Sequence, residues 1–345
     1  MNKILNIISF HGGDSHFRTC KSIRRHPHLP TQSAIIADMI LLTGGTGFVG
    51  RALARQLVDA GYDVRILLRP SPDNPRLPKG VPVEVSVVAL TDERGLRAAL
   101  RGVDQVYHLA GGESSNQLFE TDIEGTRNLV QAAGEAGVQR LIYLSHLGAD
   151  RASAFPVLRA KGIAEEHIRN GSVDYTILRS SIIFGPGDSF TESLAYISRI
   201  APGVILLPNH GEVRLQPLFV EDLVTCLLWS LENPDMQNET REIGGGEYFT
   251  LRQIMEIINS VIGKRRLFLS IPTPYVRFLN VILQASLRNY TLSGFFLDYI
   301  ATDRTCETDS LPRIFGLMPA RFTYRLDYLR RKSWLERWRE RRKQE

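Results

Sequence analysis

Thr43-Gly44-Gly45-Thr46-Gly47-Phe48-Val49-Gly50 follows a short apolar run, Met39–Thr43, and precedes a segment with helical periodicity. The order strand, glycine-rich turn and helix is typical of a dinucleotide-binding turn. Gly44 permits a tight turn, Gly47 lets the backbone approach a pyrophosphate, and Gly50 allows close packing of the helix. The helix N-terminus offers free N–H groups and a partial positive charge to the phosphates. A glycine turn with a purely structural role is the alternative. The predicted contacts to the cofactor here are Thr43, Gly44, Thr46, Gly47, Phe48, Val49 and Gly50.

The pattern on either side of this turn alternates between short β-branched runs and helical segments. The predicted strands are 39–43, 63–68, 83–88, 104–109, 138–144 and 174–179, and the predicted helices are 48–60, 92–100, 115–136 and 154–170. Asp92 and Gly137 are start and stop signals for two of the helices, and Thr250-x-x-Gln253 predicts a capping box for a later one. The alternation predicts an α/β fold, a doubly wound parallel sheet of the Rossmann type.

The chain divides into four parts by pattern. Residues 39–185 form the predicted NAD(P)-binding domain, and 186–328 form a smaller, mostly helical substrate or partner region interleaved with it. Residues 1–38 lack a sustained period, and we interpret them as a disordered or mis-assigned extension preceding a natural start at Met39. Residues 329–345 form a basic tail.

The net charge is +5 over 345 residues, with 42 basic and 37 acidic side chains. The two ends carry this excess, because 329–345 has a net charge of +5 and 1–38 of +3, which leaves −3 for 39–328. The composition, 43% hydrophobic and 23% charged, is that of a globular protein and excludes a disordered chain. No nucleic-acid-binding module is recognised, so we expect no nucleic-acid partner. The three cysteines are far apart, which argues against a metal site and favours the reducing cytoplasm.

The end of the second predicted strand indicates which dinucleotide is bound. A carboxylate there would bind the ribose hydroxyl of NAD, whereas an arginine accommodates the 2′-phosphate of NADP. The sequence has Arg69 at this point and no acid before Asp73. We therefore predict NADP(H), with NAD(H) as the alternative cofactor and a solvated loop arginine as the alternative role of Arg69.

Several motifs resemble those of the extended and atypical short-chain dehydrogenases/reductases, the NAD-dependent epimerase/dehydratase-like and NmrA-like proteins. They are the Thr-Gly-x-x-Gly-x-x-Gly turn, Val106-Tyr-His-Leu-Ala110-Gly111, Asp122-Ile-Glu-Gly125-Thr126-Arg-Asn128, Leu178-Arg179 through Gly185-Pro186-Gly187, and Phe219-Val220-Glu221-Asp222. The resemblance covers about residues 39–328 and is greatest to the group that includes the NAD(P)H-binding accessory subunit of respiratory complex I. Ser145–Ala149 and Leu158-Arg-x-Lys161-x-x-x-Glu165 are similar to segments of that group.

The resemblance implies a catalytic pair that this chain has only in part. Active members use Tyr-x-x-x-Lys on the helix after the fifth strand, where the tyrosine moves a proton and the lysine holds the nicotinamide ribose. Lys161 matches the lysine, but Val157 occupies the tyrosine position. The nearby Tyr143 and Tyr175 fall on predicted strands. The resemblance also implies cofactor contacts from Leu109, Ala110 and Gly111 at the end of the fourth strand.

Other candidate catalytic groups follow the fourth and fifth strands. Ser145 is the candidate for the serine that orients the substrate oxygen, with Leu147 as the alternative alignment. His146 and His108 are candidate acid–base groups, with structural hydrogen bonding as the alternative for both. Asp122 stands where active extended members usually have asparagine.

The basic tail contains a narrow apolar stripe, Trp334, Leu335 and Trp338. The stripe predicts peripheral contact of 329–345 with the inner face of a membrane, docking in the groove of a partner protein, or a terminal helix pinned to the domain.

Two functions follow from these features. The first is an NADP(H)-binding accessory or regulatory protein with altered or lost catalysis. The second is an active oxidoreductase, epimerase or dehydratase acting on a sugar nucleotide, a carbonyl or a quinone-like molecule.

Overall fold

The computed structural model describes residues 38–71, 77–112, 117–272 and 300–330, together with the single positions 274, 275, 278, 282 and 298. The chain separates into two units, Met1–Ile36 and Ala37–Glu345, and only residues of the second unit are described. The predicted extension, apart from residue 38, and the tail beyond residue 330 lie outside the described residues.

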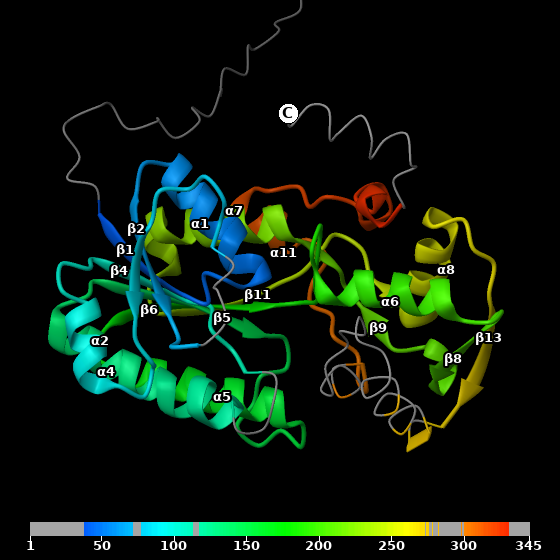
Figure 1. Cartoon of the computed structure of the whole chain (residues 1–345), viewed down its shortest axis with the longest axis horizontal. Coiled ribbons are helices and arrows are strands. Elements are labelled where there is room, and N and C mark those ends of the chain that lie inside the picture. The colour runs from blue at the N-terminus through cyan, green and yellow to red at the C-terminus, as the bar shows by residue number, and fades with distance from the viewer. Residues whose placement is uncertain are drawn as a thin grey trace, which may run out of the picture. The chain divides into compact units, whose positions relative to one another are not determined.

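A central parallel sheet of seven strands forms the core of the second unit (Figure 1). Its strands are β1 (Met39–Thr43), β2 (Asp63–Leu68), β3 (Glu84–Val87), β4 (Gln105–His108), β5 (Arg140–His146), β6 (Asp174–Ser180) and β11 (Glu239–Ile243). The spatial order is β11-β6-β5-β4-β1-β2-β3, and every neighbouring pair is parallel. The predicted doubly wound sheet is therefore confirmed, and β11 extends it beyond the six predicted strands.

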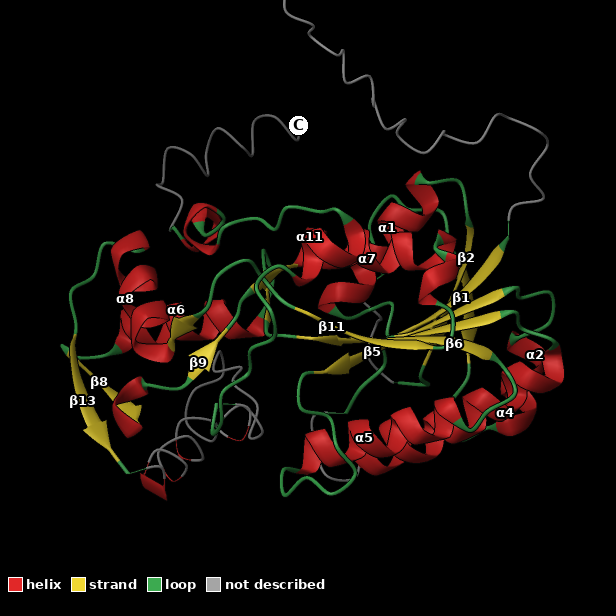
Figure 2. Cartoon of the chain, turned by 180° about the vertical axis from the view of Figure 1, so that it is seen from behind, coloured by secondary structure: helices red, strands yellow, loops and turns green. Residues whose placement is uncertain are grey.

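Helices cover both faces of this sheet (Figure 2). One face packs against α1 (Phe48–Asp59) and α7 (Val220–Glu232), and the other against α2 (Glu93–Ala99), α4 (Thr126–Ala136) and α5 (Pro156–Arg169). Alternate residues of β1 divide between the two apolar cores, because Leu42 faces α1 and α7 while Leu41 faces the other layer. This division explains why the central strands are apolar along their whole length.

The helix boundaries follow the local signals in the sequence. The Asp92 carboxylate accepts a hydrogen bond from the Gly95 N–H at 3.0 Å, and Gly137 ends α4 with φ +76°. Thr250 and Gln253 form the predicted capping box of α8 (Leu251–Val261). The predicted helix 115–136 differs in one respect, because a π-helix, η1 (Leu118–Gly125), precedes α4.

The C-terminal half contributes strands as well as helices. Its helices outside the sheet layers are α6 (Ser189–Ile200), α8 and α11 (Ser310–Phe315), with short 3-10 turns at Asn209–Gly211, Pro234–Met236, Phe322–Tyr324 and Asp327–Leu329. Its short strands are β7 (Ile183–Phe184), β8 (Val204–Pro208), β9 (Arg214–Leu215), β10 (Leu218–Phe219), β12 (Phe249–Thr250) and β13 (Leu267–Ile271). They form three two-stranded sheets, so this region is more mixed than the helical pattern predicts. No helix within the described ranges is long and apolar enough to cross a membrane.

Candidate functional site

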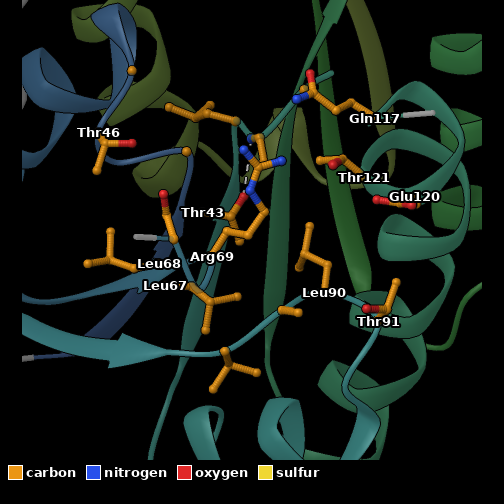
Figure 3. A pocket seen from close by; sticks show the side chains of 18 of the residues that line it. Thr43, Thr46, Leu67, Leu68, Arg69, Leu90, Thr91, Gln117, Glu120 and Thr121 are labelled. Atoms are coloured by element: carbon orange, nitrogen blue, oxygen red, sulfur yellow. Dashed lines mark hydrogen bonds between the residues drawn. The ribbon is translucent and has the colours of Figure 1, made fainter. Parts of the chain in front are cut away.

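A pocket of about 650 Å³ lies at the carboxyl ends of β1, β2, β3 and β4 (Figure 3). The order of the strands reverses between β1 and β4, and ligands of open α/β sheets bind at such a point. The lining residues are Thr43, Gly44, Thr46, Gly47, Leu67, Leu68, Arg69, Ser71, Val87, Val88, Ala89, Leu90, Thr91, Leu109, Ala110, Gly111, Gln117, Glu120 and Thr121.

The glycine-rich turn forms one wall of the pocket. Gly44 has φ +73°, and a Cβ atom there would lie 2.7 Å from the backbone carbon of Leu109. A Cβ atom at Gly50 would lie 2.1 Å from the Gly44 carbonyl oxygen, so only glycine lets α1 approach the turn this closely. Gly47 lines the pocket and is less constrained, because its added Cβ atom would meet the Gly44 carbonyl oxygen at 3.2 Å. The roles predicted for Gly44 and Gly50 agree with this geometry.

The N-terminus of α1 adjoins the pocket at Gly47. Its N-cap, Gly47, provides no side-chain hydrogen bond, and the first turn contains no acidic residue. The N–H groups of Phe48, Val49 and Gly50 belong to this first turn, although these three residues do not line the pocket. Uncapped N–H groups and the helix dipole together attract phosphate, so the wall fits the pyrophosphate of a dinucleotide.

Arg69 extends the site at the end of β2. Its side chain is exposed, lines the pocket and reaches into it in Figure 3. Among the described residues of the pocket lining, Arg69 is the basic one. Ala89, at the end of β3, adds no charge of its own to this side of the pocket.

A buried ion pair lies behind the wall formed by Leu109, Ala110 and Gly111. The Lys161 ammonium is 2.9 Å from Asp122 Oδ1, and the Lys161 and Asp122 side chains are 7% and 0% exposed. The second Asp122 oxygen accepts the Gly112 N–H at 2.7 Å. Burial disfavours the charged form of Lys161, but Asp122, with help from Tyr143, outweighs burial and raises the pKa of Lys161. A Cβ atom on Gly111 would lie 3.4 Å from the Lys161 ammonium, which places the charge next to the pocket lining.

Tyr143 is the tyrosine nearest to this ion pair. The Lys161 ammonium lies 5.0 Å from the centre of its ring, which is stacked on His108 with the two ring centroids 5.3 Å apart. Tyr143 is fully buried and does not line the pocket, and burial raises the pKa of its hydroxyl. Val157 occupies the first turn of α5 and has no group that can carry a proton.

Ser145 belongs to a structural network and does not line the pocket. Its hydroxyl donates to Glu165 Oε1 at 2.6 Å, and Glu165 is fully buried. The Glu165 carboxylate also accepts Arg179 Nε at 2.9 Å, Arg179 Nη2 at 2.7 Å and Arg169 Nη2 at 2.6 Å. This arrangement ties β5, β6 and α5 together and leaves the hydroxyl of Ser145 directed to the interior.

The two histidines are also held in the interior. His108 Nδ1 is 2.7 Å from Thr43 Oγ1, and Nε2 is 2.9 Å from Thr126 Oγ1. Burial lowers the pKa of His108 to about 3, with a further contribution from Lys161. Burial, aided by the charges of Lys161 and Arg304, lowers the pKa of His146 to about 3 as well. Both rings are neutral at pH 7, and neither lines the pocket.

The sequence identifies the glycine-rich turn and the ends of β2 and β4 as parts of the site, but it does not identify many of the other residues that line the pocket. The missed lining residues are Leu67, Leu68, Ser71, Val87, Val88, Leu90, Thr91, Gln117, Glu120 and Thr121. Most of them stand at or directly after the ends of β2 and β3, a position that itself predicts ligand contact. Glu120 and Thr121 are presented by the π-helix, which no periodicity of the sequence predicts.

Two known families match the chain. Residues 44–187 match the family described as NAD(P)H-binding, and residues 158–244 match the NAD dependent epimerase/dehydratase family.

Curated relatives include both a respiratory subunit and enzymes. The chain is 27% identical to NADH dehydrogenase (ubiquinone) 1 alpha subcomplex subunit 9, mitochondrial, of Arabidopsis thaliana, over 71% of this chain and 63% of that protein. It is 28% identical to ceramide reductase of Caulobacter vibrioides over 86% of this chain and 96% of that protein. It is 31% identical to sterol demethylase protein B of Methylococcus capsulatus over 67% of this chain and 77% of that protein.

Solved structures share the fold. The triphenylmethane reductase of Citrobacter sp., solved in complex with NADP(H), has a TM-score of 0.67 and 20% identity. The match covers 84% of this chain and 98% of that structure.

Proposed function

Because the chain belongs to the NAD(P)-binding, epimerase/dehydratase-like branch of the short-chain dehydrogenase/reductase family, we propose that it binds NADP(H) and acts as an accessory or regulatory protein. The observation that carries the proposal is the pairing of a well-formed dinucleotide pocket with Val157 in place of the proton-carrying tyrosine.

Each part of the cofactor has a fitting partner in the site. The pyrophosphate would lie against the Gly44–Gly50 turn and the α1 N-terminus, where N–H groups are available. Arg69 would hold the 2′-phosphate, which selects NADP(H) over the alternative NAD(H). Lys161 would hold the nicotinamide ribose beside Gly111, since its ammonium lies directly behind that residue.

The site lacks the usual group for proton transfer to the substrate. A bound nicotinamide would supply or accept hydride, and the protein must provide a proton at the substrate oxygen in the reducing direction or take one up in the oxidising direction. Val157 cannot provide it, the hydroxyl of Ser145 is committed to Glu165, and His108 and His146 are neutral, with His108 fully buried. These contacts support altered or lost turnover of the kind that depends on tyrosine.

The similarity to the Arabidopsis respiratory subunit supports an accessory role. The chain spans 63% of that subunit's length, so its assembly with other proteins is part of the proposal.

An active oxidoreductase, epimerase or dehydratase is the second candidate. The match to ceramide reductase favours it, because it covers 96% of that protein. A long-chain lipid carbonyl therefore joins sugar nucleotides, other carbonyls and quinones as a substrate class to be tested. In this case an acid–base group other than residue 157 must act.

A titration of the full chain with NADPH and NADH tests the cofactor assignment. We expect tighter binding of NADPH, and we expect Arg69→Glu to weaken NADPH binding much more than NADH binding. Arg55→Glu, on the exposed face of α1, is the matched control for the change of charge. An unchanged ratio of the two affinities in Arg69→Glu would refute the role of Arg69.

A turnover screen tests the accessory role. NADPH oxidation is followed with carbonyl, sugar-nucleotide, quinone and long-chain keto-lipid substrates. Binding of NADPH without oxidation, and without an epimerised or dehydrated product from the sugar nucleotides, supports the accessory function. Oxidation that depends on one of these substrates would contradict it and establish the second candidate.

A further inference from the structure

The strands β8 and β13 form a parallel pair whose outer face is apolar. Leu206 lies beside Leu269 in the register, and Leu267 lies two residues before Leu269 on the same face. The exposed fractions are 36% for Leu206, 70% for Leu267 and 54% for Leu269. The alternate residues Ile205 and Leu207 are buried in the main core, so both faces of this small sheet are apolar and only one is covered.

An open apolar face of this kind needs a partner. Parallel strands in proteins are almost always covered on both faces, and clustered exposed apolar side chains mark contact sites. The face lies at the opposite end of the described unit from β1, β2 and β4, which form the pocket (Figure 1). It is therefore distinct from the dinucleotide site.

The sequence that includes β13 is basic. Between Glu256 and Asp298 the sequence contains five basic residues and no acidic one. Lys264 and Arg265 are exposed and stand just before β13, separated from Leu267 by the half-buried Arg266. This local excess is hidden in the net charge of 39–328, which is slightly negative.

The chain after β13 continues the same combination of properties. Tyr275, Phe278 and Ile282 are exposed, and their spacing of three and four residues matches one face of a helix. Aromatic and aliphatic side chains combined with lysine and arginine are typical of segments that lie in a membrane interface.

We propose that the β8–β13 surface, formed by Leu206, Leu267 and Leu269 with Lys264 and Arg265, binds the surface of an anionic lipid bilayer. The basic side chains would contact the lipid phosphates, and the leucines would enter the region between the headgroups and the acyl chains. A lipid surface fits because exposed basic residues, Lys264 and Arg265, stand just before the strand that carries the exposed leucines.

Co-sedimentation of the full chain with vesicles tests the surface. Vesicles of phosphatidylcholine alone are compared with vesicles that also contain phosphatidylglycerol, and we expect binding to the anionic vesicles only. Leu267→Asp/Leu269→Asp and Lys264→Glu/Arg265→Glu should each lower the partition coefficient roughly tenfold or more. Met318→Asp, at a residue 79% exposed in the C-terminal segment, is the control for the apolar change, and Arg55→Glu is the control for the change of charge.

Hydrogen–deuterium exchange separates this surface from the basic tail. Peptides covering 264–272 should exchange more slowly when anionic vesicles are added, whatever the tail does. Unchanged NADPH affinity in each variant shows that the variant is folded. Equal binding to neutral vesicles, unaltered exchange of 264–272, or wild-type binding by both surface variants would overturn the proposal, and a failure to bind either kind of vesicle would point to a protein partner instead.

Discussion

Removing one charge of the Asp122–Lys161 pair should destabilise the protein strongly. The ammonium and the carboxylate are 2.9 Å apart and almost completely buried, so the remaining charge would have no solvent to compensate it. Breaking a buried pair in this way costs about 3–5 kcal/mol. We therefore expect Asp122→Asn and Lys161→Met each to lower the free energy of unfolding by about 3–5 kcal/mol. The asparagine keeps the shape of Asp122 and an acceptor for the Gly112 N–H.

A double-mutant cycle separates the charge pairing from other effects of these changes. Asp122→Asn/Lys161→Met buries no charge, so we expect its cost to be no larger than that of either single change and the coupling to be about 3 kcal/mol. The assay is urea denaturation followed by circular dichroism, with the m-value checked in each variant. Arg97→Gln/Glu135→Gln, at an exposed pair, should leave stability almost unchanged. Additive single effects, or single effects as small as those of the exposed pair, would refute the reasoning.

Three further predictions concern the turn, the buried histidines and a helix cap. Gly50→Ala places a methyl group 2.1 Å from a backbone oxygen, so it should lower the free energy of unfolding by about 3 kcal/mol and weaken NADPH binding, measured by denaturation and titration. The pKa values of His108 and His146 are lowered to about 3, so below about pH 6.5 only the unfolded chain takes up protons at these residues. Denaturation at pH 5 should therefore give a free energy of unfolding lower than at pH 7 by about 2 kcal/mol per histidine, and His108→Gln should remove about half of this loss. A free energy of unfolding that does not change between the two pH values would contradict the assignment. Thr250→Ala removes the capping box of α8 and should cost about 1 kcal/mol in the same assay, and an unchanged midpoint would argue against the cap.

The sequence predicts the central sheet well because its strands carry strong local signals. The apolar runs of β1, β2 and β6 end at the residues where polar and turn-forming side chains begin. The strand β11 has no such signal. Its sequence, Glu239–Ile243, is mostly polar because it lies at the edge of the sheet, and its position depends on pairing with β6, 63 residues earlier in the chain.

The site is less predictable because its decisive contacts join distant residues. Ser145 follows a strand end as a catalytic serine would, and only the fold reveals that Glu165, 20 residues later, accepts its hydroxyl. His108 is held in the same way by Thr43, 65 residues earlier. The sequence shows Asp122 only as a difference from the asparagine usual in active extended members, because its ion pair with Lys161 joins η1 to α5 and is not visible in the sequence.

The interleaving of the two halves limits how this protein can be rearranged in evolution. The outer strand β11 and the helix α7 both come from the region after residue 185, yet they complete the sheet and the layer beside α1. The Tyr107 hydroxyl of β4 donates to the Leu227 carbonyl of α7 at 2.9 Å, so even the interior of the first half is anchored in the second. A gene fragment ending near residue 185 would encode an open sheet edge and a bare apolar layer. The first half therefore cannot be transferred to another gene by itself. New specificities in such a chain are expected to arise by substitutions within the complete domain.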